Sequence, residues 1–138
     1  MENIQIIQQM YKDFATGNMA AVMAIFDKDV VWIRPGEPDI PFAGTFTGFE
    51  GLAKMFGIIS KTIKIKAFHP KQLLHHGDTV VAIGCDEADV IATGKSYLSE
   101  WVYVYTIKNK KITHVQVYLD SLLLSKAFQT PCPPKGET

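Results

Sequence analysis

The stretch YLSEWVYVYTIKNKKITHVQVYL, residues 97–119, decides the fold class of this chain. Apolar and polar side chains alternate on both sides of Asn109-Lys110, and a period of two is typical of β-strands. The Asn-Lys pair fits a two-residue turn, so the stretch predicts an antiparallel hairpin. A hairpin alone is barely stable in water, and we therefore expect more strands and a helical layer packed against it.

The residues before the hairpin supply further strands. Turn signals at Gly77-Asp78 and Thr93-Gly94-Lys95 bound a predicted strand from Thr79 to Ile91, and residues 63–67 alternate in the same way. A short strand is predicted at residues 30–34. The next segment, residues 35–48, holds three Pro and three Gly and is expected to be a loop or an irregular edge.

Helical patterns occupy the N-terminal part of the chain. Apolar residues recur at helical spacing after Asn3, again after Asn18, and after the capping-box pattern that begins at Thr47. Asp120 is placed to cap a short helix that runs to Phe128. We expect a single α+β domain over residues 1–128, with three N-terminal helices on one face of a cone-shaped, curved, mostly antiparallel sheet. Residues 129–138 are expected to form a Pro-rich tail.

The composition limits the classes of molecule that this chain is expected to bind. The 138 residues are 47% hydrophobic, and 14 Lys and Arg balance 14 Asp and Glu. Zero net charge argues against nucleic acid and anionic membrane surfaces as partners. No apolar run approaches the ~20 residues that span a bilayer, and residues 1–5 do not look like a leader. Two cysteines without a framework favour the reducing cytoplasm.

Metal and cofactor motifs are not found in the sequence. His75 and His76 are adjacent and would point to opposite sides of a strand, while His69 and His114 stand alone. Phosphate-binding loops, dinucleotide fingerprints and nucleophile elbows are missing as well. We therefore expect neither a metal nor a cofactor.

The hairpin predicts two faces of different character. Pairing Lys108 with Lys111 across a two-residue turn places Trp101, Tyr103 and Tyr105 opposite Tyr118, Gln116 and His114. The other face is aliphatic and is expected to form the core. The aromatic face is expected to form a homodimer interface, with its large apolar side chains drawn from Trp101, Tyr103, Tyr105 and Tyr118.

A charged cluster is predicted in a cavity between the helices and the sheet. Glu100 lies among valines on the aliphatic face, where an unpaired carboxylate is costly. If Val81 also points inward, Glu87 and Asp89 lie on the same face. Arg34, the only arginine, shares a strand face with Trp32. At least one carboxylate of such a cluster is expected to titrate above its ordinary pKa.

At this point the chain resembles the nuclear transport factor 2-like superfamily, in particular its SnoaL-like and ketosteroid isomerase-like members. The resemblance covers residues 2–128. It is carried by Asp29-Val30-Val31-Trp32, Pro41-Phe42-Ala43-Gly44, Gly48 to Gly51, Ala92-Thr93-Gly94-Lys95, Lys110-Lys111-Ile112 and Tyr118-Leu119-Asp120. These motifs are specific for the cone fold, which hosts many reactions.

The resemblance does not carry over a known set of catalytic residues. Ketosteroid isomerases place an Asp base where this chain has Arg34, and the Asp of their oxyanion hole falls near Val102. Limonene epoxide hydrolase-like enzymes have active-site residues where this chain has Val115 and Val117. Their Arg-x-Asp pair matches Glu87 and Asp89 of this chain. Their Tyr-x-Asn pair matches Trp32 and Arg34.

These observations together favour a cofactor-free enzyme of the isomerase, cyclase or lyase type. Its substrate is expected to be a small, largely apolar carbonyl or ring compound, or one that bears a carboxylate. Glu100 or Asp89 would transfer a proton and Arg34 would stabilise negative charge. Trp32, Glu87, Val102, Val117 and Leu119 would line the binding site. Two alternatives stay open, a non-catalytic binding protein and an interaction module, and Asp120 with Tyr118 could belong to the site or to the helix cap.

Overall fold

The structure is a computed structural model that describes residues 2–129. Two helices and two strands come first along the chain, followed by a third helix, four strands and a short last helix. Their bounds are α1 Asn3–Ala15, α2 Met19–Ala24, β1 Phe26–Arg34, β2 Gly44–Thr47, α3 Gly48–Thr62, β3 Ile63–His76, β4 Thr79–Val90, β5 Ser96–Lys108, β6 Lys111–Leu119 and α4 Ser121–Phe128. The predicted α+β class is confirmed, while the predicted tail at 129–138 lies outside the described residues except for residue 129.

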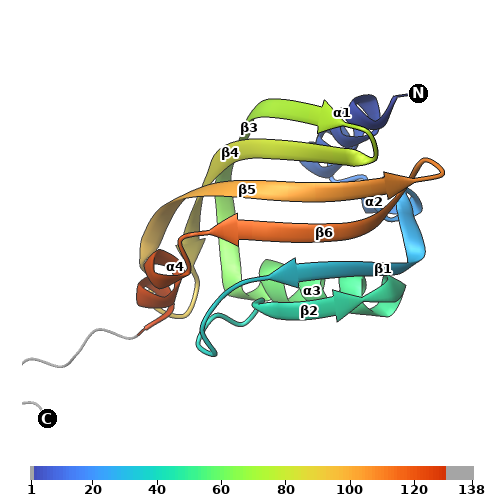
Figure 1. The fold of residues 1–138 in the computed structure, drawn as a ribbon. Coiled ribbons are helices and arrows are strands. Elements are labelled where there is room, and N and C mark those ends of the chain that lie inside the picture. Colours follow the sequence, from blue (N-terminus) through green and yellow to red (C-terminus); the bar gives the residue numbers. More distant parts are fainter. Residues whose placement is uncertain (1, 130–138) are drawn as a thin grey trace, which may run out of the picture.

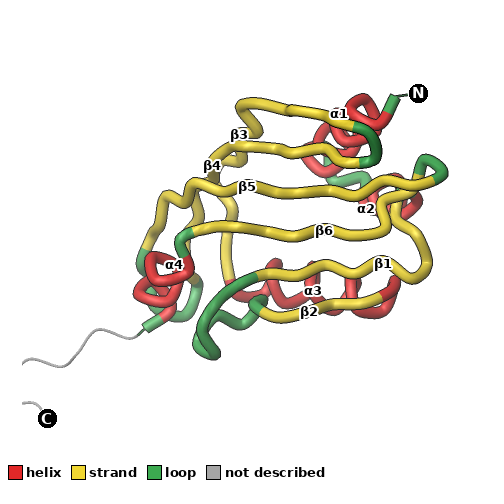
Figure 2. The backbone as a smooth tube through the Cα atoms, viewed as in Figure 1, coloured by secondary structure: helices red, strands yellow, loops and turns green. Residues whose placement is uncertain are grey.

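The sheet has six strands in the order β2-β1-β6-β5-β4-β3. All neighbours are antiparallel except β1 and β6, which run in the same direction. Figure 1 shows α1, α2 and α3 behind one face of the curved sheet, and Figure 2 shows no helix over the middle of the opposite face, with α4 at its end. We call the face toward these helices the inner face and the other the outer face.

Local sequence signals place most element ends. Asn109 and Lys110 adopt positive φ values of 52° and 63°, as the two-residue turn of the hairpin requires. The side chain of Asn18 accepts a hydrogen bond from the Ala21 backbone N–H and caps α2. Asp120 caps α4 through the N–H of Leu123 at 3.1 Å. Glu2, rather than Asn3, caps α1, and β2 forms in a segment expected to be a loop.

The predicted register of the hairpin is wrong by one residue over most of β6. A β-bulge follows Thr106, so Tyr105 pairs with Val115 and Tyr103 with Val117. The buried aromatic side chains of β5 therefore meet valines on the inner face. The predicted aromatic surface is in fact the core of the protein, and the predicted aliphatic core face is the outer face.

Large and small side chains alternate across β4 and β5 on the inner face. Gly84 pairs with Trp101, and Ala82 pairs with Tyr103. A side chain at position 84 would collide with the Trp101 ring, whose Cη2 atom lies 2.7 Å from an added Cβ. The small residues of β4 thus make room for the aromatic residues of β5, which gives this layer its close packing.

The far end of the sheet is covered by α4 and by the loop of residues 35–43. Ile40 and Phe42 of this loop are buried together with Leu124 of α4. The carboxylate of Asp39 accepts hydrogen bonds of 2.8 Å from the Ser125 hydroxyl, which fixes the loop to the helix. No helix within residues 2–129 is long and apolar enough to cross a membrane.

Candidate functional site

A cavity lies between the inner face of the sheet and helices α1 and α3. About 70 Å³ of it is open to water-sized molecules, which is room for about five waters. Its walls are largely aromatic, with contributions from Phe14, Trp32, Phe56 and Phe68. The polar groups that line it come from β1, β4, β5 and α1, and they are Arg34, Asp86, Tyr97, Tyr103, Tyr105 and Tyr11.

Arg34 is the cation of the cavity. Its Nη2 atom donates a hydrogen bond of 3.4 Å to the Tyr103 hydroxyl, and its Cζ atom lies 5.3 Å from the centre of the Phe42 ring. The Nε–H is buried and has no hydrogen-bond partner. A buried donor that lacks an acceptor is costly, so this N–H favours a ligand oxygen beside it.

Asp86 is the carboxyl group of the cavity. Burial raises its pKa to about 6, and the nearby Arg34 guanidinium offsets part of that rise. Arg34 and Asp86 are not joined as an ion pair, because the ion pairs within residues 2–129 both involve Lys66. A carboxyl group that titrates near neutral pH beside a separate cation is suited to proton transfer.

Neutral hydroxyl groups complete the polar lining. Burial raises the pKa values of Tyr11, Tyr97 and Tyr105 well above the usual range, so all three stay protonated at neutral pH. The Trp32 indole N–H is buried without a partner. The cavity therefore holds more hydrogen-bond donors than acceptors, and it is suited to a ligand with exposed oxygen atoms.

Two of the predicted site residues line this cavity. Trp32 and Arg34 point inward from β1, as their shared strand face predicts. Val117 is fully buried in the core without lining the cavity, and Leu119 packs against that core. The face of β1 that carries Trp32 and Arg34 therefore points into the cavity, as predicted.

Glu100 and Val102 do not lie at the cavity. Both belong to the outer face of β5, and Glu100 is exposed. The predicted inward orientation of Glu100 is wrong because the true core face of β5 is the aromatic one. For the same reason Trp101, Tyr103 and Tyr105 are buried within the chain and cannot form the predicted dimer interface, although Tyr118 is exposed. The homodimer itself stays a prediction.

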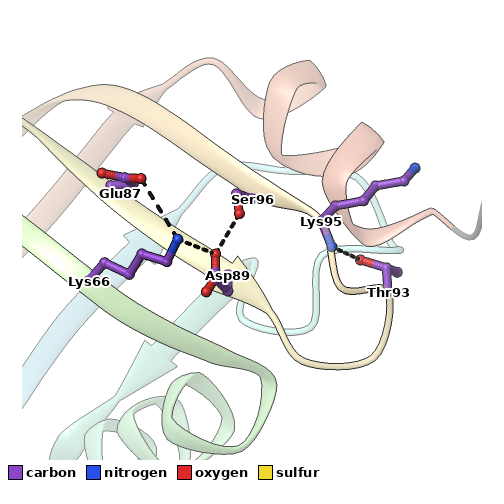
Figure 3. Close-up of polar contacts among 6 residues, drawn as sticks. All are labelled: Lys66, Glu87, Asp89, Thr93, Lys95 and Ser96. Atoms are coloured by element: carbon purple, nitrogen blue, oxygen red, sulfur yellow. Dashed lines mark hydrogen bonds and ion pairs between the residues drawn. The ribbon is translucent and has the colours of Figure 1, made fainter.

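Glu87 and Asp89 also lie away from the cavity. Figure 3 shows Lys66 reaching both carboxylates, at 3.9 Å from Glu87 and 3.0 Å from Asp89. Asp89 additionally accepts a hydrogen bond from Ser96, and the hydrogen bonds from Ser96 and Lys66 lower the pKa of its carboxyl. Partly exposed pairs of this kind contribute little to stability. The lowered pKa makes the Asp89 carboxylate a weak base, which does not fit its predicted role.

Sequence reasoning missed Asp86. Both faces of β4 carry apolar residues. The prediction takes Val81 as an inward-facing residue, whereas the fully buried one is Val80, so the predicted inner face is shifted by one position. One signal was available: Ala82, Gly84 and Ala88 are small and alternate with larger neighbours, as expected of residues packed under aromatic rings. Asp86 belongs to that same series.

Within residues 2–129, no cluster of three or more His, Cys, Asp and Glu side chains could hold a metal ion. Chemistry at the cavity can draw on one cation, one carboxyl group of raised pKa and several neutral donors. Such a set can bind an oxygen atom, transfer a proton and stabilise an oxyanion.

Residues 7–115 match the family described as the SnoaL-like domain. The chain belongs to this family. A search of the curated proteins found no significant match.

Solved structures share the fold of this chain. An NTF2-like protein from Burkholderia xenovorans is 28% identical, with a TM-score of 0.84 over 92% of this chain and 95% of the other. A putative isomerase from Rhodopseudomonas palustris is 15% identical, with a TM-score of 0.76 over 92% and 96% of the two chains. A putative SnoaL-like polyketide cyclase from Mesorhizobium loti is 19% identical, with a TM-score of 0.72 over 86% and 99%. The last two likenesses show a shared fold alone.

Proposed function

We propose that this SnoaL-like protein is a cofactor-free enzyme that moves a proton on a small, largely apolar ring or carbonyl compound. The observation that carries the proposal is the partly buried Asp86 carboxyl group, whose pKa is raised to about 6 beside an Arg34 guanidinium with an unpartnered N–H. Asp86 takes the proton-transfer role predicted for Glu100 or Asp89, because it is the only carboxyl group among the described residues that lines the cavity.

The reaction follows from these positions. In its ionised form Asp86 removes a proton from the carbon next to a carbonyl group, and the electron pair moves onto the carbonyl oxygen. Arg34 stabilises the resulting enolate through its free Nε–H. Where the substrate has a carbon–carbon double bond conjugated with the enolate, Asp86 returns the proton to the far carbon of that bond, and the double bond moves to give an isomer. The aromatic walls exclude water and so strengthen both electrostatic contacts.

Arg34→Gln tests this arrangement in an assay that does not require the natural substrate. The wild-type protein is incubated in deuterium oxide with a panel of single-ring ketones and β-dicarbonyl compounds, and mass spectrometry measures deuterium uptake. We expect catalysed uptake for at least one compound. Loss of the oxyanion contact is expected to slow it by about 100-fold.

Glu100→Gln is the control, because it also replaces a charged side chain by glutamine but does so on the exposed outer face. It is expected to leave uptake unchanged, and a urea unfolding curve of each variant verifies that it is folded. Equal losses in Arg34→Gln and Glu100→Gln would contradict the proposal, as would wild-type uptake no faster than in buffer for the whole panel.

A second candidate function is ligand binding without chemistry. It is favoured by the single carboxyl group of the cavity, since many proton transfers use a separate acid and base. In that case the single-ring compounds bind the wild-type protein, Arg34→Gln weakens their binding, and no compound takes up deuterium faster than in buffer.

A further inference from the structure

Tyr97 is a polar group of the cavity that the proposed reaction does not use. It lies near the start of β5, is only 7% exposed, and lines the cavity. No residue of the described part of the chain forms a hydrogen bond with its hydroxyl group. A buried hydroxyl group whose hydrogen has no acceptor is costly, so Tyr97 favours a ligand oxygen beside it.

The register of the sheet places Tyr97 next to Asp86. Ala88 pairs with Tyr97 and Asp86 pairs with Ser99, so Asp86 and Tyr97 are diagonal neighbours on the inner face. Diagonal neighbours of an antiparallel pair are about 7–8 Å apart, which is within reach of an aromatic side chain. Figure 1 shows β5 curving toward α4 at this end of the strand. Tyr97 therefore belongs to the end of the cavity that holds Asp86.

The charges of Asp86 and Arg34 both act on the Tyr97 hydroxyl group. Burial is the main cause of its raised pKa, the Asp86 carboxylate adds to the rise, and the Arg34 guanidinium offsets part of it. The raised pKa keeps the hydroxyl group protonated at neutral pH, so it stays a hydrogen-bond donor. Two free donors, the Tyr97 O–H and the Arg34 Nε–H, thus lie near one carboxyl group.

Apolar walls face this polar end. Phe14, Phe56 and Ile65 line the cavity and also line a groove beside α3. The apolar surface of the cavity therefore continues toward this groove. A ligand that fits both regions has its oxygen atoms on one edge and an apolar body on the other.

We propose that the Tyr97 hydroxyl group donates a hydrogen bond to a second oxygen atom of the substrate, on the same edge as the oxygen that Arg34 binds. This inference rests on the proposed function, in which the Arg34 Nε–H binds the carbonyl oxygen. The substrate class is then a carbonyl compound that carries another oxygen atom close to its carbonyl group. Tyr97 determines specificity for this second oxygen and transfers no proton, while Asp86 remains the base.

The test compares probes that differ in one acceptor atom. The first pair is 2-methoxyacetophenone and 2-ethylacetophenone, in which a CH₂ group replaces the ether oxygen beside the acetyl group. In the second pair, 4-methoxy- and 4-ethylacetophenone, the same exchange is made at the opposite end of the ring. NMR titration gives each dissociation constant. We expect the wild-type protein to bind 2-methoxyacetophenone about three- to tenfold more tightly than its ethyl partner, the worth of one hydrogen bond.

Tyr97→Phe is expected to remove the preference within the first pair and to leave the ratio within the second pair unchanged. Tyr118→Phe is the matched control, because it removes the same hydroxyl group from an exposed side chain. It is expected to change neither ratio. Damage to the fold would weaken both members of a pair equally and would leave their ratio intact. Arg34→Gln is expected to weaken both members of the first pair by a similar factor.

Two results would overturn the inference. One is equal binding of 2-methoxy- and 2-ethylacetophenone by the wild-type protein, or binding of neither. The other is a preference that persists in Tyr97→Phe. Both leave the proposed function in place, because deuterium uptake by the wild-type protein and by Arg34→Gln decides it separately.

Discussion

Asp86→Asn is expected to slow deuterium uptake by a factor of about 10² to 10⁴, because it removes the proton-transferring group. The same change is expected to make the folded protein harder to unfold at pH 8. If Asp86→Asn loses activity and gains stability, the Asp86 carboxyl group is catalytic and not structural, because the loss of a structural ion pair would destabilise the protein.

The expected gain in stability follows from the raised pKa. Burial raises the pKa of Asp86 from 3.8 to about 6, so the folded state holds its proton more tightly than the unfolded chain does. The stabilisation by this proton is complete below pH 3.8 and is lost as the pH rises through about 6. The full difference corresponds to about 3 kcal/mol. Above pH 7 the wild-type protein carries a buried charge that Asn does not.

Urea unfolding at several pH values measures this effect. The free energy of unfolding of the wild-type protein, relative to that of Asp86→Asn, is expected to fall by up to about 3 kcal/mol between pH 4 and pH 8. Asp89→Asn is the matched control: its carboxyl has a lowered pKa, and the variant is expected to lose a little stability instead. A difference between wild type and Asp86→Asn that does not change with pH would refute the burial of this carboxyl.

Gly84→Ala is expected to destabilise the protein by about 3 kcal/mol or more. An added Cβ would overlap the carbonyl oxygen of His69 and would lie 2.7 Å from Trp101 Cη2 and 2.9 Å from Pro70 Cα. Two of these neighbours are backbone atoms of β3, which cannot move without breaking strand pairing. Overpacking of this kind commonly costs 1–3 kcal/mol, and the involvement of the backbone places this site at the upper end or beyond.

Gly57→Ala is the control for that substitution. Gly57 lies in α3, and a Cβ added there meets nothing within 4 Å. Alanine is a better helix former than glycine, so this variant is expected to gain about 0.5–1 kcal/mol. Urea unfolding followed by tryptophan fluorescence measures both variants. If Gly84→Ala is as stable as the wild-type protein, the inference that β4 packs tightly against Trp101 is wrong.

Local features of this fold could be predicted from the sequence and non-local features could not. The Asn109-Lys110 turn, the Asn18 and Asp120 caps and the helical layer each depend on neighbouring residues. The strand β2 could not be predicted, because Gly44–Thr47 extends only by pairing with β1. Its four residues have no pattern of their own.

The candidate site was predicted in part for the same reason. Trp32 and Arg34 share one face of β1, and both line the cavity as predicted. Glu100 was misplaced, and Asp86 missed, because β4 and β5 carry apolar residues on both faces and the period of two does not tell which face is buried. The apolar positions of β6 did mark the bulge: Ile112 and Val115 are three residues apart, where an unbroken strand would have them two apart.

The bulge between β5 and β6 leaves Thr113 unpaired, because Thr106 pairs with His114 while Ile107 pairs with Ile112. If Thr113 paired with Thr106 instead, His114, Gln116 and Tyr118 would face Tyr105, Tyr103 and Trp101, and the inner valines would reach the surface. One unpaired residue thus decides whether β6 turns its valines or its polar side chains toward the core. Deleting Thr113 would make the pairing regular and keep the valines inside.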